Sequence, residues 1–205
     1  MSNAVPMNFV PTATPEDRAR ANFYALLARL FYAPPDEDLL EGLAAADEIE
    51  AEDATTGLAL AWRDLKRASA NTDEESAQDE FDAVFVGVGK ADVSPYLAAY
   101  ASAAGVDNPL VELREFLDSL GLARHASVNE PEDHVAALCE VMRHLILERP
   151  GDLELQRAFF STHLWPGGPA FCTAAAGAAP AKFYKAVAVF ARSFLELEHT
   201  AFEMQ

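Results

Sequence analysis

Apolar side chains recur at three- and four-residue intervals along most of this chain, and that spacing restricts it to helical architectures. The clearest run precedes residue 150 and consists of Val135, Leu138, Cys139, Met142, Leu145 and Ile146. A second run near the C-terminus consists of Phe183, Val187, Phe190, Phe194 and Leu197. The strict apolar–polar alternation that is typical of a half-buried strand is missing from the sequence. The pattern predicts an all-α, single-domain helical bundle of about nine to ten helices.

Residues that favour helix starts and stops divide the chain further. Thr14 followed by Pro15 predicts a first helix that ends before Pro34, and Asp36 is expected to cap a second. Thr72 with Glu75 is typical of a capping box for a fourth helix. The other expected helices are 55–68, 94–103, 109–120, 132–148, 152–164 and 181–200, with a break at 166–169. Residues 1–13 are expected to be a disordered tail and residues 14–205 a single domain.

The net charge of −18, from 15 basic and 33 acidic residues, excludes some classes of partner. Nucleic acid is not expected as a ligand, because phosphate binding requires clustered Lys and Arg. The acidic residues gather in two stretches without basic residues, between Arg29 and Arg63 and between Arg67 and Lys90. Two interpretations stay open: a solvated face that keeps the protein soluble, or an electrostatic funnel for a basic ligand.

The sequence also bears on where the protein works. No apolar run approaches the ~18 residues of a membrane-spanning helix, and the N-terminus lacks the basic and apolar regions of a secretory signal. Cys139 and Cys172 are far apart and do not form a disulfide framework. We therefore expect a cytoplasmic protein that does not insert directly into a membrane.

The segment Glu130-Pro131-Glu132-Asp133-His134 concentrates ionisable groups before the apolar run of 135–146. Its structural interpretation is helix initiation, since Pro suits the first turn and acids there complement the helix dipole. His134 is unusual because it titrates near neutral pH and directly follows a carboxylate. An alternative is therefore a helical-bundle hydrolase of nucleotides or phosphoesters that uses Asp133 and His134 as an acid–base pair.

Other catalytic and ligand-binding patterns are weak. The chain does not supply the two Glu-x-x-His pairs of a bundle metal site, and the cysteines lack a Cys-x-x-Cys partner, so no metal is expected. Ser94 has no nucleophile-elbow glycines around it. Gly87-Val88-Gly89-Lys90 is only a partial match to a phosphate-binding loop. Neither a catalytic residue nor a required cofactor is predicted.

Four segments in this order and spacing resemble the TorD/DmsD family of cytoplasmic molybdoenzyme chaperones. They are Asn22 to Tyr32, Phe81 to Tyr96, Glu130 to His134, and Gln156 to Pro166. The resemblance runs from about Pro15 to the C-terminus and implies a non-enzymatic, all-helical chaperone. Its partner would be the precursor of a molybdopterin-containing reductase of the DMSO or TMAO reductase type, held for cofactor insertion before export. The resemblance also implies a monomer or a helix-swapped dimer, and it leaves weak guanine nucleotide binding open.

In the resembled family, the matching positions surround a pocket for the twin-arginine signal peptide of the client. The implied peptide-binding residues are Tyr32, Phe81, Val84, Phe85, Pro95, Tyr96, Glu130, Asp133 and His134. Aromatic groups would contact the apolar part of the peptide, and acids at the rim would face its arginines. This sequence departs from the family after Tyr96, where Leu97-Ala98 replaces the Glu-Ser of many members.

Overall fold

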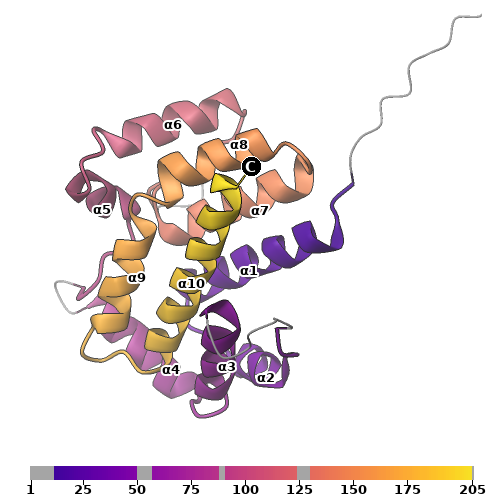
Figure 1. Ribbon diagram of the computed structural model, residues 1–205. Coiled ribbons are helices and arrows are strands. Elements are labelled where there is room, and N and C mark those ends of the chain that lie inside the picture. The colour runs from indigo at the N-terminus through magenta and orange to yellow at the C-terminus, as the bar shows by residue number, and fades with distance from the viewer. Residues whose placement is uncertain (1–11, 50–56, 88–90, 124–129, 205) are drawn as a thin grey trace, which may run out of the picture.

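The computed structural model describes residues 12–49, 57–87, 91–123 and 130–204, which form a bundle of ten α-helices (Figure 1). The α-helices are α1 (Pro15–Tyr32), α2 (Glu37–Ala45), α3 (Gly57–Ser69), α4 (Glu74–Phe81), α5 (Leu97–Ala103), α6 (Pro109–Ser119), α7 (Val135–Glu148), α8 (Leu153–Phe159), α9 (Gly168–Gly177) and α10 (Phe183–Glu203). Two π-helical turns, η1 (Asp82–Val86) and η2 (Phe160–Leu164), extend α4 and α8. The predicted all-α class is confirmed. Most of the expected tail, up to Pro11, lies outside the residues that the structure describes.

Helix caps agree with the sequence at some ends and differ at others. Thr14 forms a complete capping box with Asp17, and Asp36 caps α2 through the N–H of Leu39, as predicted. The prediction for Thr72 is wrong: the adjacent Asp73 caps α4 by accepting a hydrogen bond from the N–H of Ser76. The charged acceptor one residue further along the chain therefore defines the start of that helix.

The start of α7 also differs from the prediction of a helix from 132. The helix begins at Val135, and His134 is its N-cap residue. Pro131 lies in the preceding turn, where its carbonyl accepts the N–H of His134 at 3.2 Å. The acids before His134 are thus outside the helix and available for other contacts.

Helices α1, α7 and α10 organise the bundle. Helix α1 packs along α7, and α10 packs against α9 on one side and α3 on another. Figure 1 shows α10 running through the middle of the molecule, with α2, α3 and α4 toward one end and α6, α7 and α8 toward the other. Gly167 permits a close approach at the start of α9, because a Cβ there would lie 2.7 Å from the carbonyl oxygen of Leu97.

The core is rich in edge-to-face aromatic contacts between helices far apart in the sequence. Phe23 of α1 contacts Trp62 of α3 and both Phe190 and Phe194 of α10, with centroid distances of 5.3–5.6 Å. Such pairs stabilise a core beyond the area that they bury. Cys139 lies buried on the predicted core face of α7.

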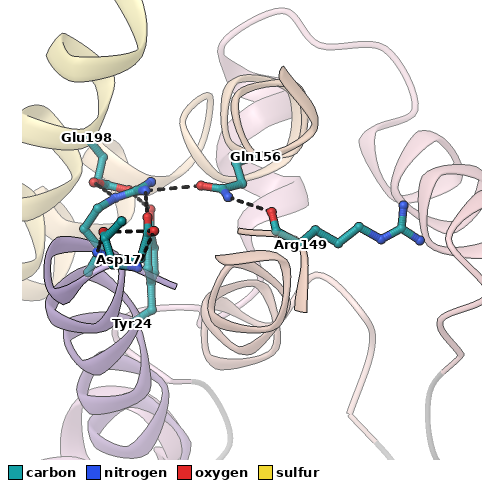
Figure 2. Close-up of polar contacts among 7 residues, drawn as sticks. Asp17, Tyr24, Arg149, Gln156 and Glu198 are labelled. Atoms are coloured by element: carbon teal, nitrogen blue, oxygen red, sulfur yellow. Dashed lines mark hydrogen bonds and ion pairs between the residues drawn. The ribbon is translucent and has the colours of Figure 1, made fainter. Parts of the chain in front are cut away.

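One polar cluster lies within this core and ties three helices together (Figure 2). Arg20 of α1 donates from Nε and Nη2 to the two carboxylate oxygens of Glu198 on α10, at 2.8 and 2.9 Å. It also donates to the side chain of Gln156 on α8 at 3.2 Å, and the hydroxyl of Tyr24 donates to Glu198 at 3.0 Å. We call these four residues the clasp.

In the part of the chain that the structure describes, each helix is either too short or too polar to cross a membrane.

Candidate functional site

A cavity of about 530 Å³ opens between the C-terminal half of α1, the end of α6 and the first three turns of α7. Its lining is mostly apolar, with ionisable groups among the apolar side chains. The lining residues are Ala28, Arg29, Tyr32, Leu117, Leu122, Ala123, Glu130, Pro131, Glu132, His134, Ala136, Ala137, Glu140, Val141 and His144. We call it the α1–α7 cavity. Its volume falls in the range of protein ligand sites.

Two of the motifs meet at one edge of this cavity through backbone hydrogen bonds. Tyr96 and His134 form an isolated antiparallel bridge. The carbonyl of Pro95 accepts the N–H of Val135, and the carbonyl of Asp133 accepts the N–H of Leu97, both at 2.9 Å. Segments about forty residues apart in sequence are thereby held in a fixed register.

The carboxylate of Asp133 points toward α5. Its Oδ2 accepts the backbone N–H of Ala98 at 3.1 Å, and the side chain is buried. The first N–H groups of a helix have no partner within it, so this bond caps α5 and places a negative charge at its positive end. The contact gives Asp133 a structural role at the junction of α5 and α7.

His134 presents its ring to the cavity while capping α7. Its Nδ1 accepts the N–H of Ala136 at 3.1 Å, so the neutral ring carries its proton on Nε2. Its ring contacts those of Tyr96 and Tyr32 edge-on, with centroid distances of 5.5 and 6.3 Å. Burial lowers the pKa of His134, and the carboxylates of Glu130 and Asp133 oppose that shift. Burial and the cap therefore both favour the neutral form of the ring.

Each carboxylate at the cavity has a partner within the protein. Glu130 accepts a hydrogen bond from the hydroxyl of Tyr96, which raises the pKa of Tyr96 to about 12, with burial adding to the shift. Glu132 is bound by Arg114 of α6, and Glu140 by Arg143 one turn along α7. The lining itself contains these three carboxylates and one guanidinium, that of Arg29, so carboxylates outnumber guanidiniums among the lining side chains.

Apart from Asp133, which caps α5, the predicted site residues fall into two groups. Tyr32, Glu130 and His134 line the α1–α7 cavity, and Pro95 and Tyr96 adjoin it through the contacts described above. Phe81, Val84 and Phe85 instead lie buried in the core on α4 and η1, outside the cavity lining. Phe85 packs against Phe31 and Tyr184. Phe31 lies on the buried side of α1, the helix that also carries Tyr32.

Sequence reasoning missed the wall that α7 contributes. Ala137, Val141 and His144 lie on one helix face at four- and three-residue spacing and line the cavity together with Leu117 at the end of α6 and Leu122 just beyond it. Small or polar residues on an otherwise apolar helix are the signal that could have located this face. The residues from α6 carry no comparable signal, because only the tertiary fold places them there.

The arrangement does not provide an acid–base pair. The carboxylate of Asp133 is used by α5 and Nδ1 of His134 by α7, so neither atom is directed at a substrate. The partial phosphate-loop match at 87–90 falls largely outside the described residues, which resume at Ala91. The geometry thus gives a binding cavity, and the alternative of a hydrolase has no support from it.

Comparison with known proteins supports the same conclusion. Residues 51–173, more than half of the chain, match the model of the family described as nitrate reductase delta subunit. Curated relatives include the chaperone protein TorD of Aliivibrio fischeri, 28% identical over 149 residues, which are 65% of this chain and 69% of that protein. The TorD proteins of Photobacterium profundum and Vibrio cholerae are 25% and 30% identical over segments that span 60% and 51% of their lengths, and 58% and 50% of this chain.

A solved structure shares the fold across almost the whole chain. It is a protein from Archaeoglobus fulgidus described as a redox enzyme maturation protein, with a TM-score of 0.52 and 18% sequence identity. The match covers 93% of this chain and 99% of that one. At that coverage the match extends beyond residues 51–173, the segment matched by the family model. The chain therefore belongs to the nitrate reductase delta subunit family, which includes the TorD chaperones, and it is a chaperone of molybdoenzyme maturation rather than an enzyme.

Proposed function

We propose that this protein is a cytoplasmic chaperone that binds the twin-arginine signal peptide of a molybdopterin-containing reductase precursor. In this proposal, the α1–α7 cavity receives the apolar stretch of the signal peptide, and the carboxylates at the cavity face its arginines. The protein also holds the apo form of the reductase until the cofactor has been inserted. The observation that carries the proposal is the combination of an apolar cavity with excess negative charge on its lining.

The chemistry of such a signal peptide matches the cavity in both respects. An apolar stretch, helical when bound, can place its side chains against Ala137, Val141 and Leu117, as amphipathic helices do in apolar grooves. Tyr32 is 60% exposed although it is a large aromatic residue at the cavity, and bound peptide would cover it. Carboxylates bind guanidinium groups through short, charge-assisted hydrogen bonds.

The direct test is a titration of the purified protein with a synthetic twin-arginine signal peptide from a reductase gene next to its own. Saturable binding is expected, and a scrambled peptide of the same composition should bind more weakly. The whole apo-reductase should bind at least as tightly. If neither peptide nor apo-reductase binds saturably, the proposal is wrong.

A pair of variants tests the location of the site. Tyr32→Ala should weaken peptide binding by roughly tenfold, because a truncated aromatic anchor typically costs more than 1 kcal/mol at an interface. Leu60→Ala is the matched control: Leu60 is also an exposed apolar residue, but it lies on α3 outside the cavity lining. Equal affinities of the two variants would place the peptide elsewhere on the protein.

A further inference from the structure

The carboxylate of Glu132 lines the α1–α7 cavity and is already bound to an arginine of this chain. Arg114 reaches it from α6, donating from Nε at 3.1 Å and from Nη2 at 3.0 Å. Both donors meet the same carboxylate oxygen, Oε2. The Arg114 side chain is 53% exposed, whereas that of Glu132 is only 16% exposed. An arginine thus approaches a sheltered carboxylate from the solvent side.

A second arginine–glutamate pair in the same molecule provides a comparison. In the clasp, Arg20 and Glu198 form two parallel hydrogen bonds that use both carboxylate oxygens, and Glu198 is almost fully buried (Figure 2). Two parallel hydrogen bonds form the strong arrangement of a guanidinium and a carboxylate. The pair of Arg114 and Glu132 lacks the parallel geometry, and water reaches its arginine. Of the two pairs, it is the one that an incoming guanidinium can exchange.

We propose that Glu132 is the carboxylate that recognises an arginine of the signal peptide, and that Arg114 is a resting partner of Glu132 that is displaced when the peptide binds. The inference rests on the proposed function and assigns a specificity-determining residue to that site. In the exchange, one guanidinium replaces another on Glu132, so no buried charge is left without a partner. Arg114, being largely exposed, returns to water.

This exchange has two physical consequences. First, Arg114 competes with the peptide, so the free energy of its contact with Glu132 is subtracted from the free energy of binding. Second, Glu132 discriminates in favour of arginine, because the planar guanidinium can form the two-oxygen geometry and a lysine ammonium cannot. Affinity should therefore rise when Arg114 is removed, but only for peptides that carry the arginines.

The test measures dissociation constants by fluorescence anisotropy for two labelled peptides, the twin-arginine form and a form with both arginines replaced by glutamine. Arg114→Ala should bind the twin-arginine form roughly fivefold more tightly, the scale of one exposed ion pair, and the glutamine form with unchanged affinity. Arg192→Ala is the matched control. It removes an exposed, ion-paired arginine from α10 and makes the same change in net charge, but Arg192 pairs with Glu196, which does not line the cavity.

Two further variants isolate the role of Glu132. Glu132→Gln should abolish the preference for the twin-arginine form over the glutamine form, and adding Arg114→Ala to it should give no further gain. Arg114→Gln keeps most of the side chain and serves as the second form of the Arg114 change if the alanine variant folds poorly by circular dichroism.

The outcomes separate this inference from the proposed function. If the unmodified protein binds neither peptide, the proposed function fails and this inference fails with it. If the unmodified protein binds the twin-arginine form but both Arg114 variants bind it with unchanged or lower affinity, the competition by Arg114 is disproved while the proposed function stands. A gain of the same size in Arg192→Ala would also overturn the inference, because it would reduce the effect to net charge.

Discussion

Asp133 and His134 are adjacent in the sequence, yet their side chains serve two different helices. Asp133 caps α5 through the N–H of Ala98, and His134 caps α7 through the N–H of Ala136. The backbone bridge between Tyr96 and His134 lies between these two caps. A change at either residue should therefore act on stability as well as on binding.

We expect Asp133→Ala to lower the free energy of unfolding by about 1–2 kcal/mol, the usual effect of losing a helix cap. Asp133→Asn keeps an oxygen that can accept the N–H of Ala98 and should lose less. Urea denaturation measured by circular dichroism provides the comparison. If both variants are as stable as the unmodified protein, the cap contributes nothing and Asp133 is free to act on a ligand.

His163 is a buried titratable residue outside the candidate site. Its ring lies between Phe116 and Phe159, at centroid distances of 5.1 and 5.3 Å, and its Nε2 has no hydrogen-bond partner among the described residues. Burial lowers the pKa of His163 from 6.5 to about 4. Protonation is thus easier in the unfolded chain than in the folded protein.

The sign of the pH effect follows from this shift. The neutral form stabilises the fold above pH 6.5, and that stability is lost progressively as the pH falls toward 4, on the order of 3 kcal/mol in total. His163→Leu should reduce the loss of stability between pH 6.5 and pH 4, measured by urea denaturation at each pH. His144→Leu, at an exposed position on α7, is the control. Parallel curves for the unmodified protein and His163→Leu would contradict the assignment.

At the scale of elements, the clasp fixes α1 against α10 and α8. Arg20 and Glu198 are separated by most of the chain, and Gln156 joins them from α8 (Figure 2). Arg20 also lies over the ring of Phe202 at 5.4 Å. Because α1 forms one wall of the α1–α7 cavity, the clasp contributes to the position of that wall.

Removing one partner of the clasp leaves the other charge buried, which is costly. We expect Glu198→Ala to lower the free energy of unfolding by about 3 kcal/mol. Glu196→Ala is the matched control on the same helix, since Glu196 pairs with Arg192 at the surface. The measurement is urea denaturation of both variants. Equal losses of stability would show that the buried position of the clasp adds nothing.

The sequence predicted helices better than it predicted which contacts join them. Apolar spacing located α7 and α10, since one buried face of a long helix leaves a periodic pattern. The clasp could not be predicted, because its polar residues show no periodicity and meet only after folding. The family resemblance placed Phe81, Val84 and Phe85 near a bound peptide, whereas the structure buries them in the core. The sequence pattern around an aromatic residue next to a turn is the same whether its side chain faces a cavity or the core.

At the scale of the whole molecule, the net charge of −18 extends beyond the cavity. Acids on α2 and α4 belong to the two stretches without basic residues, and they lie toward the end of the molecule opposite α6 and α7 (Figure 1). The acids on α2 and α4 lie outside the cavity lining, so we expect their effect on binding to act through the long-range field. A field of this kind changes the rate of association more than the lifetime of the complex.

This distinction leads to a prediction about salt. The association rate of a twin-arginine peptide should fall as salt rises, because the screening length shortens from about 10 Å at 0.1 M to about 3 Å at 1 M. Its dissociation rate should change much less, since it depends mainly on apolar contacts in the cavity. Stopped-flow fluorescence at several salt concentrations separates the two rates. A peptide whose basic residues are all replaced by glutamine should lose the salt dependence; if the native peptide shows none either, the acidic surface serves solubility and not recognition.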